Sequence, residues 1–584
     1  MTKENIINLK IDGIDVQVPE GTTILNAARK VNINIPTICF LKEINEIGDC
    51  RMCLVEIEGR KGFVASCMQK AEEGMVVRTN TGSIMEARRI MLDLILSNHK
   101  RNCLTCTRNG NCELQALAEQ YNITEIEYDG EQLEPKIDEL SPAIVRDTSK
   151  CILCRRCVSV CKKVQQVGAI DVVNRGFNSC VSTVCNSSLN NVNCTFCGQC
   201  IEVCPVGALK EKDSTKEVWQ KLNDKDTYVV VQTAPAVRVA LGEEFGMPIG
   251  TNVQGKMVAA LRRLGFDKVF DTNTGADLTI MEEGTEFLKR LKKKEKLPLI
   301  TSCSPGWIKY IEMNYPELLN NVSTCKSPQS MFGAVLKTYF AQKMKIDPKK
   351  VFVVSVMPCI AKKFERQREE LKNDGLYNVD AVITTRELAR MIKQAHIDFT
   401  QLEDEQYDNP MGEATGAGAI FGVTGGVMEA ALRTVYETVT GKELAKLEFE
   451  DVRGAEGIKR AVVNIDNEKI KVVVANGLGN AKKIMEEIKN GKADYQFVEI
   501  MACPGGCIMG GGQPIHNSKT KHTINVQKLR TDALYTIDEK SKIRKSHENP
   551  VIKILYKDFL QKPGSHIAHE LLHTTYIKRP KYNI

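Results

Sequence analysis

Three short motifs in the second half of the chain place cysteines directly after apolar runs. They are Thr301-Ser-Cys-Ser-Pro-Gly-Trp307, Met357-Pro-Cys-Ile-Ala-Lys-Lys363 and Glu499-Ile-Met-Ala-Cys-Pro-Gly-Gly-Cys507. Short apolar runs of this kind predict buried strands, and open α/β sheets hold ligands beyond the carboxyl ends of their strands. We therefore predict one thiolate-lined pocket that is assembled from three distant segments.

A buried, inert cysteine is the ordinary interpretation of each motif alone, since free cysteine is among the most buried residue types. The third motif, however, continues through residues 508–514 and surrounds its two cysteines with five glycines, and a second glycine-rich stretch covers residues 412–426. The second stretch lacks the patterns of phosphate and dinucleotide loops. Close approach of a bulky cofactor to both backbones is the better explanation, and three such motifs together favour ligands.

Two cysteine runs in the first third of the chain share the spacing Cys-x2-Cys-x2-Cys-x3-Cys. Bacterial ferredoxins with two [4Fe–4S] clusters have this spacing, and the fourth cysteine of each run binds the other run's cluster. One cluster is therefore predicted on Cys151, Cys154, Cys157 and Cys204. The other is predicted on Cys194, Cys197, Cys200 and Cys161.

Two further sets precede these runs. The first set is Cys39, Cys50, Cys53 and Cys67, and the second is His99, Cys103, Cys106 and Cys112. Four thiolates, or three thiolates with an imidazole, suit either zinc or an iron–sulfur cluster. The spacing leaves both metals open, but the four sets together indicate a chain of electron-transfer clusters.

Composition sets the class of protein. The chain has 584 residues, enough for several domains, and a net charge of +7 with interspersed signs, which gives no argument for binding nucleic acid or a membrane. No apolar run is long enough for a membrane span, and the first residues lack the apolar core of a signal peptide. Grouped cysteines, 22 in all, favour metal over disulfides, so a cytoplasmic protein is expected.

The predicted elements give a multidomain α/β and α+β protein. Residues 3–19 read as a hairpin, and apolar runs that alternate with helical stretches beyond residue 226 predict largely parallel sheets in two lobes. The glutamates at 282, 283 and 286 lie in a helical stretch, where a solvated face is the ordinary interpretation. The last seventy residues read as a loop-rich tail with short helices.

Over essentially its full length the chain resembles the large, monomeric clostridial [FeFe]-hydrogenases. The resemblance rests on the three strand-end motifs, with the continuation Ile508-Met-Gly-Gly-Gly-Gln-Pro514, and on the four N-terminal ligand sets. It implies a β-grasp [2Fe–2S] ferredoxin-like domain (1–80), a His/Cys3 [4Fe–4S] domain (81–125), a two-cluster ferredoxin-like domain (140–210), a catalytic α/β domain (226–515) and a small-subunit-like tail (516–584). One [2Fe–2S] and three [4Fe–4S] accessory clusters are thus expected.

The resemblance also implies an H-cluster, a [4Fe–4S] cubane joined through one cysteine to a two-iron centre with CO, cyanide and a bridging azadithiolate. Cys359, Cys503 and Cys507 match cubane ligands, with Cys507 as the bridge, and Lys362 matches a cyanide-binding lysine. The residues that match packing positions around the two-iron centre are Ala234, Pro235, Pro328, Gln329, Met357, Phe421 and Met501.

One position departs from the family pattern Thr-Ser-Cys-Cys-Pro, because Ser304 replaces the second cysteine. A serine hydroxyl is a harder and weaker iron ligand than a thiolate. Ser304 supplies an oxygen ligand, or Cys303 shifts to bind, or the site is altered. The register of the motif favours Ser304 in the ligand position and Cys303 as the proton relay.

The resemblance implies reversible proton reduction, 2H⁺ + 2e⁻ ⇌ H2. The proton route then carries over to Cys303, Glu283, Ser323 and Glu286, with Arg290 near the exit. Electrons are expected from ferredoxin or a similar low-potential carrier, and maturation proteins are expected to install the cofactor.

Three other classes of protein share parts of this pattern. A non-catalytic iron–sulfur assembly factor lacks the two-iron centre; Ser304 favours it, whereas the complete Cys503–Pro514 loop does not. No signalling segment supports a hydrogen sensor. A subunit of an NADH-oxidising complex would have no use for the cysteine motifs at 359 and 503–507.

Overall fold

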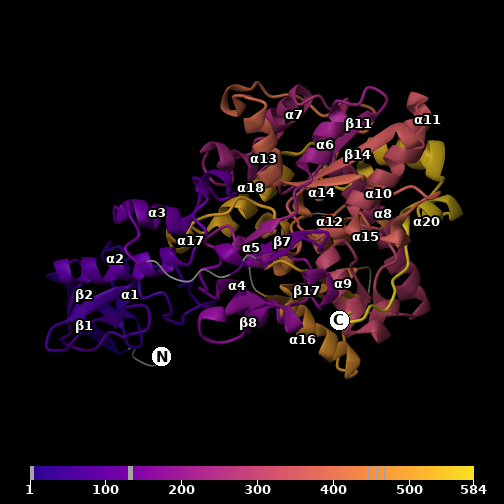
Figure 1. The fold of residues 1–584 in the computed structure, drawn as a ribbon. Helices are drawn as coiled ribbons and strands as arrows, with labels where there is room; N and C mark the ends of the chain where they lie inside the picture. The colour runs from indigo at the N-terminus through magenta and orange to yellow at the C-terminus, as the bar shows by residue number, and fades with distance from the viewer. Residues whose placement is uncertain are drawn as a thin grey trace.

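The computed structural model describes residues 5–128, 134, 136–444, 446–454, 457–465 and 468–583. The first four residues of the predicted 1–80 domain and the last residue of the predicted tail therefore lie outside the described residues. A small N-terminal unit occupies one end of the molecule, and a large α/β body occupies the other (Figure 1).

The N-terminal unit is a five-stranded sheet in the order β2-β1-β5-β3-β4. Strands β1 (Ile6–Ile11) and β2 (Ile14–Pro19) form the predicted hairpin, and its Asp12-Gly13 turn has two positive φ angles of 49° and 83°, as a tight hairpin turn requires. The other strands are β3 (Leu54–Ile57), β4 (Val64–Ala65) and β5 (Val76–Arg78). Helix α1 (Ile24–Lys30), capped by the Thr23 side chain, contributes to the core.

Helices α2 (Gly82–Ser97) and α3 (Glu113–Gln120) flank the next cysteine set. A ferredoxin-like region follows, with the sheet β10-β7-β6 and the pair β8-β9. Its elements are β6 (Ile137–Asp138), β7 (Ile144–Asp147), α4 (Arg156–Ser159), β8 (Asp171–Val173), β9 (Cys180–Ser182), α5 (Gln199–Glu202) and β10 (Leu209–Glu211).

Two four-stranded sheets build the large body. The first, in the order β12-β11-β14-β15, is parallel throughout, and the second, β13-β18-β17-β16, adds one antiparallel edge strand. The strands are β11 (Tyr228–Thr233), β12 (Lys268–Asp271), β13 (Leu299–Ile300), β14 (Val351–Met357), β15 (Ala381–Thr384), β16 (Ile458–Ile465), β17 (Glu468–Asn476) and β18 (Phe497–Met501). The predicted two-lobed α/β architecture is confirmed.

Helices cover both sheets because the strands are apolar on both faces. In β17, Val472 and Val474 join one core cluster, whereas Val473 and Ala475 join another on the opposite face. The helices are α6 (Thr215–Leu222), α7 (Gln254–Arg263), α8 (Thr272–Lys293), α9 (Pro305–Asn314), α10 (Pro328–Val335), α11 (Ala341–Met344), α12 (Lys362–Glu365), α13 (Thr385–Gln394), α14 (Gly416–Ile420), α15 (Gly426–Thr440) and α16 (Leu478–Lys489).

Some glycines of the two glycine-rich stretches allow protein segments to meet backbone to backbone. A Cβ on Gly510 would lie 2.3 Å from the Pro358 carbonyl oxygen, and one on Gly425 would lie 2.1 Å from the Val452 carbonyl oxygen. Both distances are shorter than real Cβ contacts. The predicted approach of a cofactor to these stretches stays a prediction.

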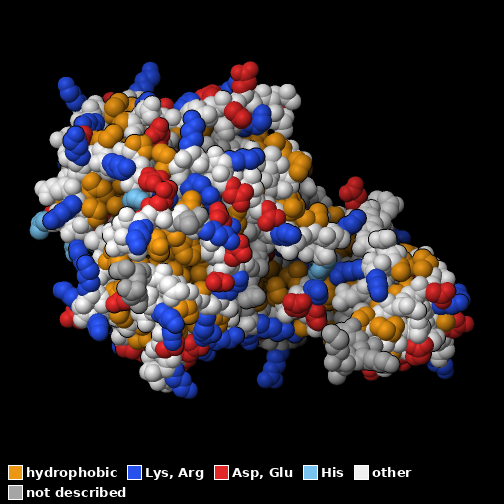
Figure 2. Space-filling model, turned by 180° about the vertical axis from the view of Figure 1, so that it is seen from behind, with side chains coloured by type: hydrophobic (Ala, Val, Ile, Leu, Met, Phe, Trp, Pro, Cys, Tyr) orange, Lys and Arg blue, Asp and Glu red, His pale blue; other side chains and the backbone are white. Residues whose placement is uncertain are grey.

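The C-terminal tail contains α17 (Ser518–Thr523), α18 (Val526–Lys540), α19 (Pro550–Leu555) and α20 (His566–Leu572). It is more helical than predicted, and α20 packs against α10 of the large body. No helix among the described residues is long and apolar enough to cross a bilayer. Acidic and basic side chains intermix over most of the face in Figure 2, in agreement with the interspersed charges of the sequence.

Candidate active site

A cavity lies where the carboxyl ends of the two sheets meet. Cys303 follows β13, Cys359 follows β14, and Cys503 and Cys507 follow β18. All four line the cavity, so the predicted convergence of three motifs is confirmed. The other predicted residues on its wall are Ala234, Pro235, Ser304, Pro328, Gln329, Met357, Lys362, Phe421 and Met501.

The cysteines of the cavity are buried thiols with few positive partners. Burial raises the pKa of Cys359, of Cys503 and of Cys507 above the ordinary value, because a thiolate is poorly solvated there. Lys362 is the nearby cation that lowers the pKa of Cys359 and Cys507. Such thiols become thiolates when they bind a metal ion, so the donor set fits an iron cluster.

Two polar side chains of the cavity wall are placed to form hydrogen bonds with a bound ligand. Lys362 Nζ donates to Glu365 Oε2 at 2.7 Å and to the Cys303 carbonyl oxygen at 3.2 Å. Gln329 Nε2 also donates to Glu365, at 3.0 Å, but its buried Oε1 has no protein partner. A buried polar atom without a partner is costly, and a ligand in the cavity would satisfy it.

Cys303 and Ser304 adjoin different partners. The Cys303 thiol interacts with Glu283 and with Cys507, whereas Ser304 Oγ accepts a hydrogen bond from the Ala502 amide at 3.2 Å. Cys303 therefore lies on the side of the glutamates of α8, and Ser304 lies beside the segment that carries Cys503.

The glutamates of α8 do not form the solvated face that the sequence pattern indicates. Glu282 and Glu283 are both 1% exposed, and Glu286 is half-buried. Burial raises the pKa of Glu283 to about 8, the Ser323 hydroxyl lowers this value and the Glu286 charge adds to it. Glu283 Oε1 has no protein partner. A carboxyl group with this pKa can exchange protons near neutral pH.

The predicted route continues from Glu283 through Ser323, which interacts with it, to Glu286 and Arg290. Ser323 Oγ donates to Glu286 Oε2 at 3.1 Å, and Glu286 Oε1 pairs with Arg290 at 2.6 Å. Arg290 also donates to the carbonyl oxygens of Asn320, Asn321 and Val322. The structure thus brings all five predicted route residues together.

The two ferredoxin-like runs are arranged with the predicted exchange of their fourth cysteines. Cys204 interacts with Cys151, Cys154 and Cys157, whereas Cys161 interacts with Cys194, Cys197 and Cys200. The loops are also alike: Leu153 and Phe196 have φ of 55° and 57°, and each amide lies 3.4 Å from the sulfur of the first cysteine of its run.

The two earlier sets bring their sulfur atoms together in part. The sulfur atoms of Cys53 and Cys67 lie 3.3 Å apart, and the Cys39 thiol interacts with Cys50. Buried His99 has an unpartnered Nδ1, as a ligand would before binding.

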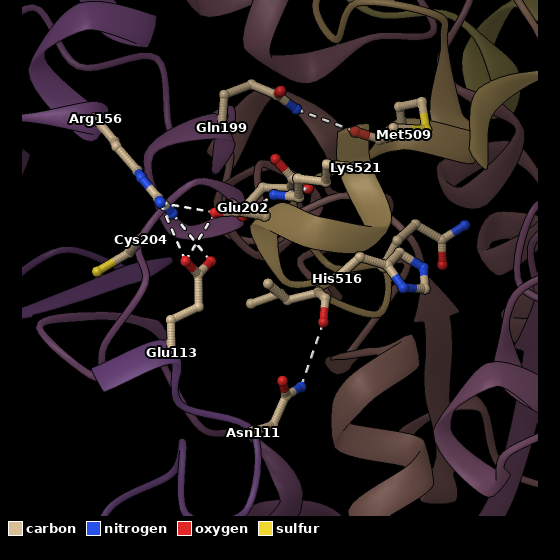
Figure 3. Close-up of polar contacts among 12 residues, drawn as sticks. Asn111, Glu113, Arg156, Gln199, Glu202, Cys204, Met509, His516 and Lys521 are labelled. Carbon is tan, nitrogen blue, oxygen red and sulfur yellow. Dashed lines mark hydrogen bonds and ion pairs between the residues drawn. The ribbon is translucent and has the colours of Figure 1, made fainter. Parts of the chain in front are cut away.

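The ferredoxin-like region reaches the cavity directly. Cys197 lines it, and Cys503 Sγ lies 4.0 Å from the Cys197 carbonyl oxygen. Segment 509–521 joins the two regions (Figure 3): Gln199 donates to the Met509 carbonyl oxygen at 3.1 Å, and Lys521 pairs with Glu202 at 2.7 Å. These contacts hold the second ferredoxin-like run directly against the cavity.

A buried pair fixes the same junction further out. Arg156 forms two 3.0 Å bonds with Glu113 and a 2.7 Å bond with Ser518 Oγ. Asn111 donates to the Ile515 carbonyl oxygen at 3.3 Å (Figure 3). Three regions, the His/Cys3 segment, the ferredoxin-like region and the tail, are thus held at one point.

Comparison with known proteins decides the family. Residues 227–511 match the family described as "Iron only hydrogenase large subunit, C-terminal domain", and residues 524–579 match "Iron hydrogenase small subunit". The chain belongs to the iron-only hydrogenases. Residues 4–82 match a 2Fe–2S cluster binding domain, residues 88–127 an iron–sulfur binding region of NADH-ubiquinone oxidoreductase, and residues 141–210 a ferredoxin-like domain of NADH-quinone oxidoreductase.

Several relatives match this hydrogenase over almost their whole length. It is 50% identical to the NADP-reducing hydrogenase subunit HndD of Solidesulfovibrio fructosivorans, over 99% of this chain and 100% of the relative. It is 44% identical to iron hydrogenase 1 of Clostridium pasteurianum, over 97% and 99%. Protein NAR1 of Arabidopsis thaliana is 32% identical, over 66% of this chain and 85% of the relative.

Solved structures share the fold of about two thirds of this chain. The structure of a variant of apo [FeFe]-hydrogenase HydA1 from Chlamydomonas reinhardtii is 45% identical, with a TM-score of 0.56 over 63% of this chain and 99% of that chain.

Sequence reasoning missed two carboxylates beside the cavity. Glu365 holds Lys362 and Gln329, and buried Glu499 of β18 accepts bonds from the amides of Gly425 and Met428 at 2.7 Å each. Both glutamates lie within or next to recognised motifs. A charged residue inside the apolar run 496–500 was the available signal for Glu499.

Proposed function

We propose that this hydrogenase catalyses 2H⁺ + 2e⁻ ⇌ H2 at an H-cluster held in the cavity between the two sheets. The observation that carries the proposal is the convergence of Cys359, Cys503 and Cys507 on one largely apolar cavity, with Lys362 in its wall. An H-cluster supplies iron for the binding and heterolytic cleavage of H2 and a basic group that exchanges protons with the protein.

The chain's own residues hold this group and exclude water from it. Cys359 and Cys503 are assigned to the cubane, and Cys507 to the bridging position. Lys362 would donate to a cyanide ligand, and the apolar side chains of Met357, Phe421 and Met501 would close the cavity around the diatomic ligands. Ala234, Pro235, Pro328 and Gln329 complete this wall.

Ser304 is assigned to the fourth ligand position of the cubane. Its support is geometric: Ser304 lines the cavity beside Ala502, whereas the Cys303 thiol interacts with Glu283. An oxygen ligand is harder than a thiolate, so cubane binding is weaker at this corner.

Protons move along Cys303, Glu283, Ser323 and Glu286 to the surface near Arg290. In the direction of hydrogen evolution, Glu283 gives its proton to Cys303 and takes another through the Ser323 hydroxyl from Glu286. The pKa of Glu283, about 8, lets it serve in both directions.

One [2Fe–2S] and three [4Fe–4S] clusters would supply the path for electrons to the cavity. Cys39, Cys50, Cys53 and Cys67 would hold the first; His99, Cys103, Cys106 and Cys112 would hold the second; and the two exchanged sets would hold the others. Ferredoxin or a similar low-potential carrier is the proposed partner. Because the relative HndD is described as a subunit of an NADP-reducing hydrogenase, a companion subunit that exchanges electrons with NADP is the alternative.

The protein is proposed to act in the cytoplasm and to receive its cofactor from maturation proteins. None of its 22 cysteines forms a disulfide, which fits a reducing compartment.

Infrared spectroscopy of the anaerobically matured protein tests the proposal. Bands of iron-bound CO and cyanide are expected, and the Ser304→Cys variant should bind the cubane more tightly and keep the same band pattern. A protein that holds its full iron content but shows no such bands would be an assembly-type protein and not a hydrogenase.

A further inference from the structure

Three side chains outside the cysteine sets gather at the outer end of the proton route. A carboxylate oxygen of Glu286, the Cys325 sulfur and a ring nitrogen of His573 all lie within 4.8 Å of one another. Cys325 is 0% exposed and His573 9% exposed, and Cys325 Sγ lies 3.9 Å from Glu286 Oε2. None of the predicted clusters uses Cys325 or His573.

The fold, and not local sequence, creates this group. Residues Thr324–Lys326 pair in antiparallel fashion with the chain after α20, through the bridge between Cys325 and His573. The Thr574 amide donates to the Thr324 carbonyl oxygen at 2.7 Å, and the Lys326 amide donates to the Leu572 carbonyl oxygen at 2.8 Å. The pairing fixes His573 of the tail beside Glu286 of α8.

His573 is oriented as metal-binding histidines are. Its Nε2 lies 3.1 Å from Glu282 Oε2, and its Nδ1 lies 2.8 Å from Thr324 Oγ1. An imidazole that donates one N–H to a carboxylate has a lone pair on the other nitrogen that can bind a metal. In His573 the Thr324 hydroxyl contacts this nitrogen, so zinc has to displace that hydroxyl to bind. Glu282 is itself fixed by Tyr556, whose hydroxyl donates to it at 2.6 Å, and by the Gly564 amide.

The group can be reached from solvent. Glu286 and His573 line a surface pocket together with Glu282, Thr324 and His569. The His569 ring stacks on His573 with ring centroids 4.6 Å apart. Cys325 lies behind this wall, so a cation that enters the pocket meets two ligands first and the thiol last.

We propose that Glu286, Cys325 and His573 form a binding site for Zn²⁺, and that bound zinc blocks proton transfer at Glu286. One nitrogen, one sulfur and one oxygen ligand with a fourth position open to water is a donor set that zinc accepts, whereas Mg²⁺ prefers oxygen alone. Binding replaces the proton of Cys325, which leaves to solvent.

The block follows from the bonds that Glu286 already makes. Its Oε1 pairs with Arg290, and its Oε2 accepts from Ser323 Oγ at 3.1 Å and from the Thr324 amide at 3.0 Å. Zinc would take the Oε2 lone pair that otherwise accepts a proton. The binding site stands independently of the proposed function, whereas the inhibition rests on it.

The test measures zinc binding and hydrogen evolution on the same matured holoenzyme. Zinc chloride at increasing concentration is equilibrated with the protein, bound zinc is counted by elemental analysis, and iron content is checked to be unchanged. One tightly bound zinc per chain and a matching loss of hydrogen evolution are expected, with no effect of magnesium chloride.

Variants locate the site. Cys325→Ser and His573→Gln should each raise the zinc concentration for half-inhibition at least about tenfold, since even the loss of an outer partner usually weakens metal binding by this much. Each variant is compared with itself without zinc, so changes in basal rate cancel. His547→Gln is the matched control, because His547 belongs to the other His-containing group of described residues whose ligand atoms come this close, with Glu437 and Glu548.

The outcomes separate the two parts of the inference. Zinc binding that is unchanged in both ligand variants, or that is lost in His547→Gln, overturns the site. Stoichiometric binding that depends on Cys325 and His573 but leaves the rate unchanged supports the site and contradicts proton transfer through Glu286.

Discussion

The accessory clusters and the catalytic cavity use the same ligand, cysteine, but assemble it in opposite ways. Each ferredoxin-like loop draws three ligands from seven consecutive residues, such as 151–157, and its backbone conformation recurs in the second loop. The cavity draws its thiols from residues 303 to 507, at the ends of β13, β14 and β18. The electron path is thus encoded locally, whereas the catalytic site depends on two complete sheets and their helices.

The two regions also differ in what surrounds the ligands. In the electron path, backbone amides approach the sulfurs, as at Leu153 and Phe196. Around the cavity the wall is largely apolar, and two buried oxygens in or near it, Gln329 Oε1 and Glu283 Oε1, have no protein partner. Substitutions of cavity residues should therefore abolish hydrogen turnover, whereas substitutions of ligands in the electron path should slow the supply of electrons.

The largest effect is expected for Glu283→Gln. The substitution keeps the shape of the side chain but removes its proton exchange, and it should lower turnover about 100- to 10,000-fold with unchanged iron content. The control Glu282→Gln alters an equally buried neighbour that bonds to Tyr556 and His573 instead. A Glu283→Gln enzyme with the wild-type rate would refute the route.

The second-largest effect is expected when Arg156, at the junction of the two regions, is replaced. Arg156→Ala leaves the half-buried Glu113 carboxylate with the Ser518 hydroxyl as its remaining partner. The loss of the cation should cost about 3 kcal/mol and speed amide hydrogen exchange in segment 515–521. Arg155→Ala is the matched control, because Arg155 is half exposed and pairs with exposed Asp49; a surface pair of this kind contributes about 0–1 kcal/mol. Equal exchange in both variants would contradict the role of the junction.

Smaller, graded effects are expected along the electron path. Cys200→Ser damages the cluster that adjoins the cavity and should slow hydrogen evolution with any donor. Cys103→Ser removes the exposed ligand of the His/Cys3 set. With a small donor such as reduced viologen, this variant should slow hydrogen evolution severalfold less than Cys200→Ser does. Exposed Cys185, which belongs to no set, serves as the control, and Cys185→Ser should have no effect. If Cys103→Ser slowed hydrogen evolution from reduced viologen more than Cys200→Ser did, the result would contradict the proposed direction of the electron path.

The smallest expected effect is a pH dependence of the rate that has opposite signs for hydrogen evolution and hydrogen oxidation. Because burial raises the pKa of Glu283 to about 8, its protonated form disappears as the pH rises through this value. Hydrogen evolution, which needs that proton, should then fall, whereas hydrogen oxidation, which needs the ionised carboxylate, should rise. Rates in both directions across this interval provide the measurement, and parallel slopes would argue against Glu283 as the exchanging group.

The same pH change affects stability. Glu283 binds its proton more tightly in the folded state than its ordinary pKa of 4.5 would allow. Its contribution to stability is therefore fully present below this ordinary value and is lost as the pH rises through about 8.

The contrast between the two regions also explains what the sequence could predict. The spacing of the cysteines alone predicts the two ferredoxin-like sets with exchanged fourth ligands. The position of the other motifs after predicted strands predicts that Cys303, Cys359 and the 503–507 loop lie close together. Periodicity did not identify Glu283 as buried, because an acidic triplet on a helix usually faces water, and the burial of α8 depends on distant segments such as α15 and the tail. For the glycine-rich stretches, composition shows that space is needed but not what fills it: Gly506 and Gly510 line the cavity, whereas Gly425 lies against the Val452 backbone.

Hydrogen evolution from reduced viologen by the anaerobically matured chain tests the central claim most directly, with Cys507→Ala as the comparison. We predict hydrogen evolution by the unmodified chain and none by the variant, with the accessory iron retained in both. A chain that carries all its iron but evolves no hydrogen would contradict the claim that the thiols between the two sheets hold a catalytic cluster.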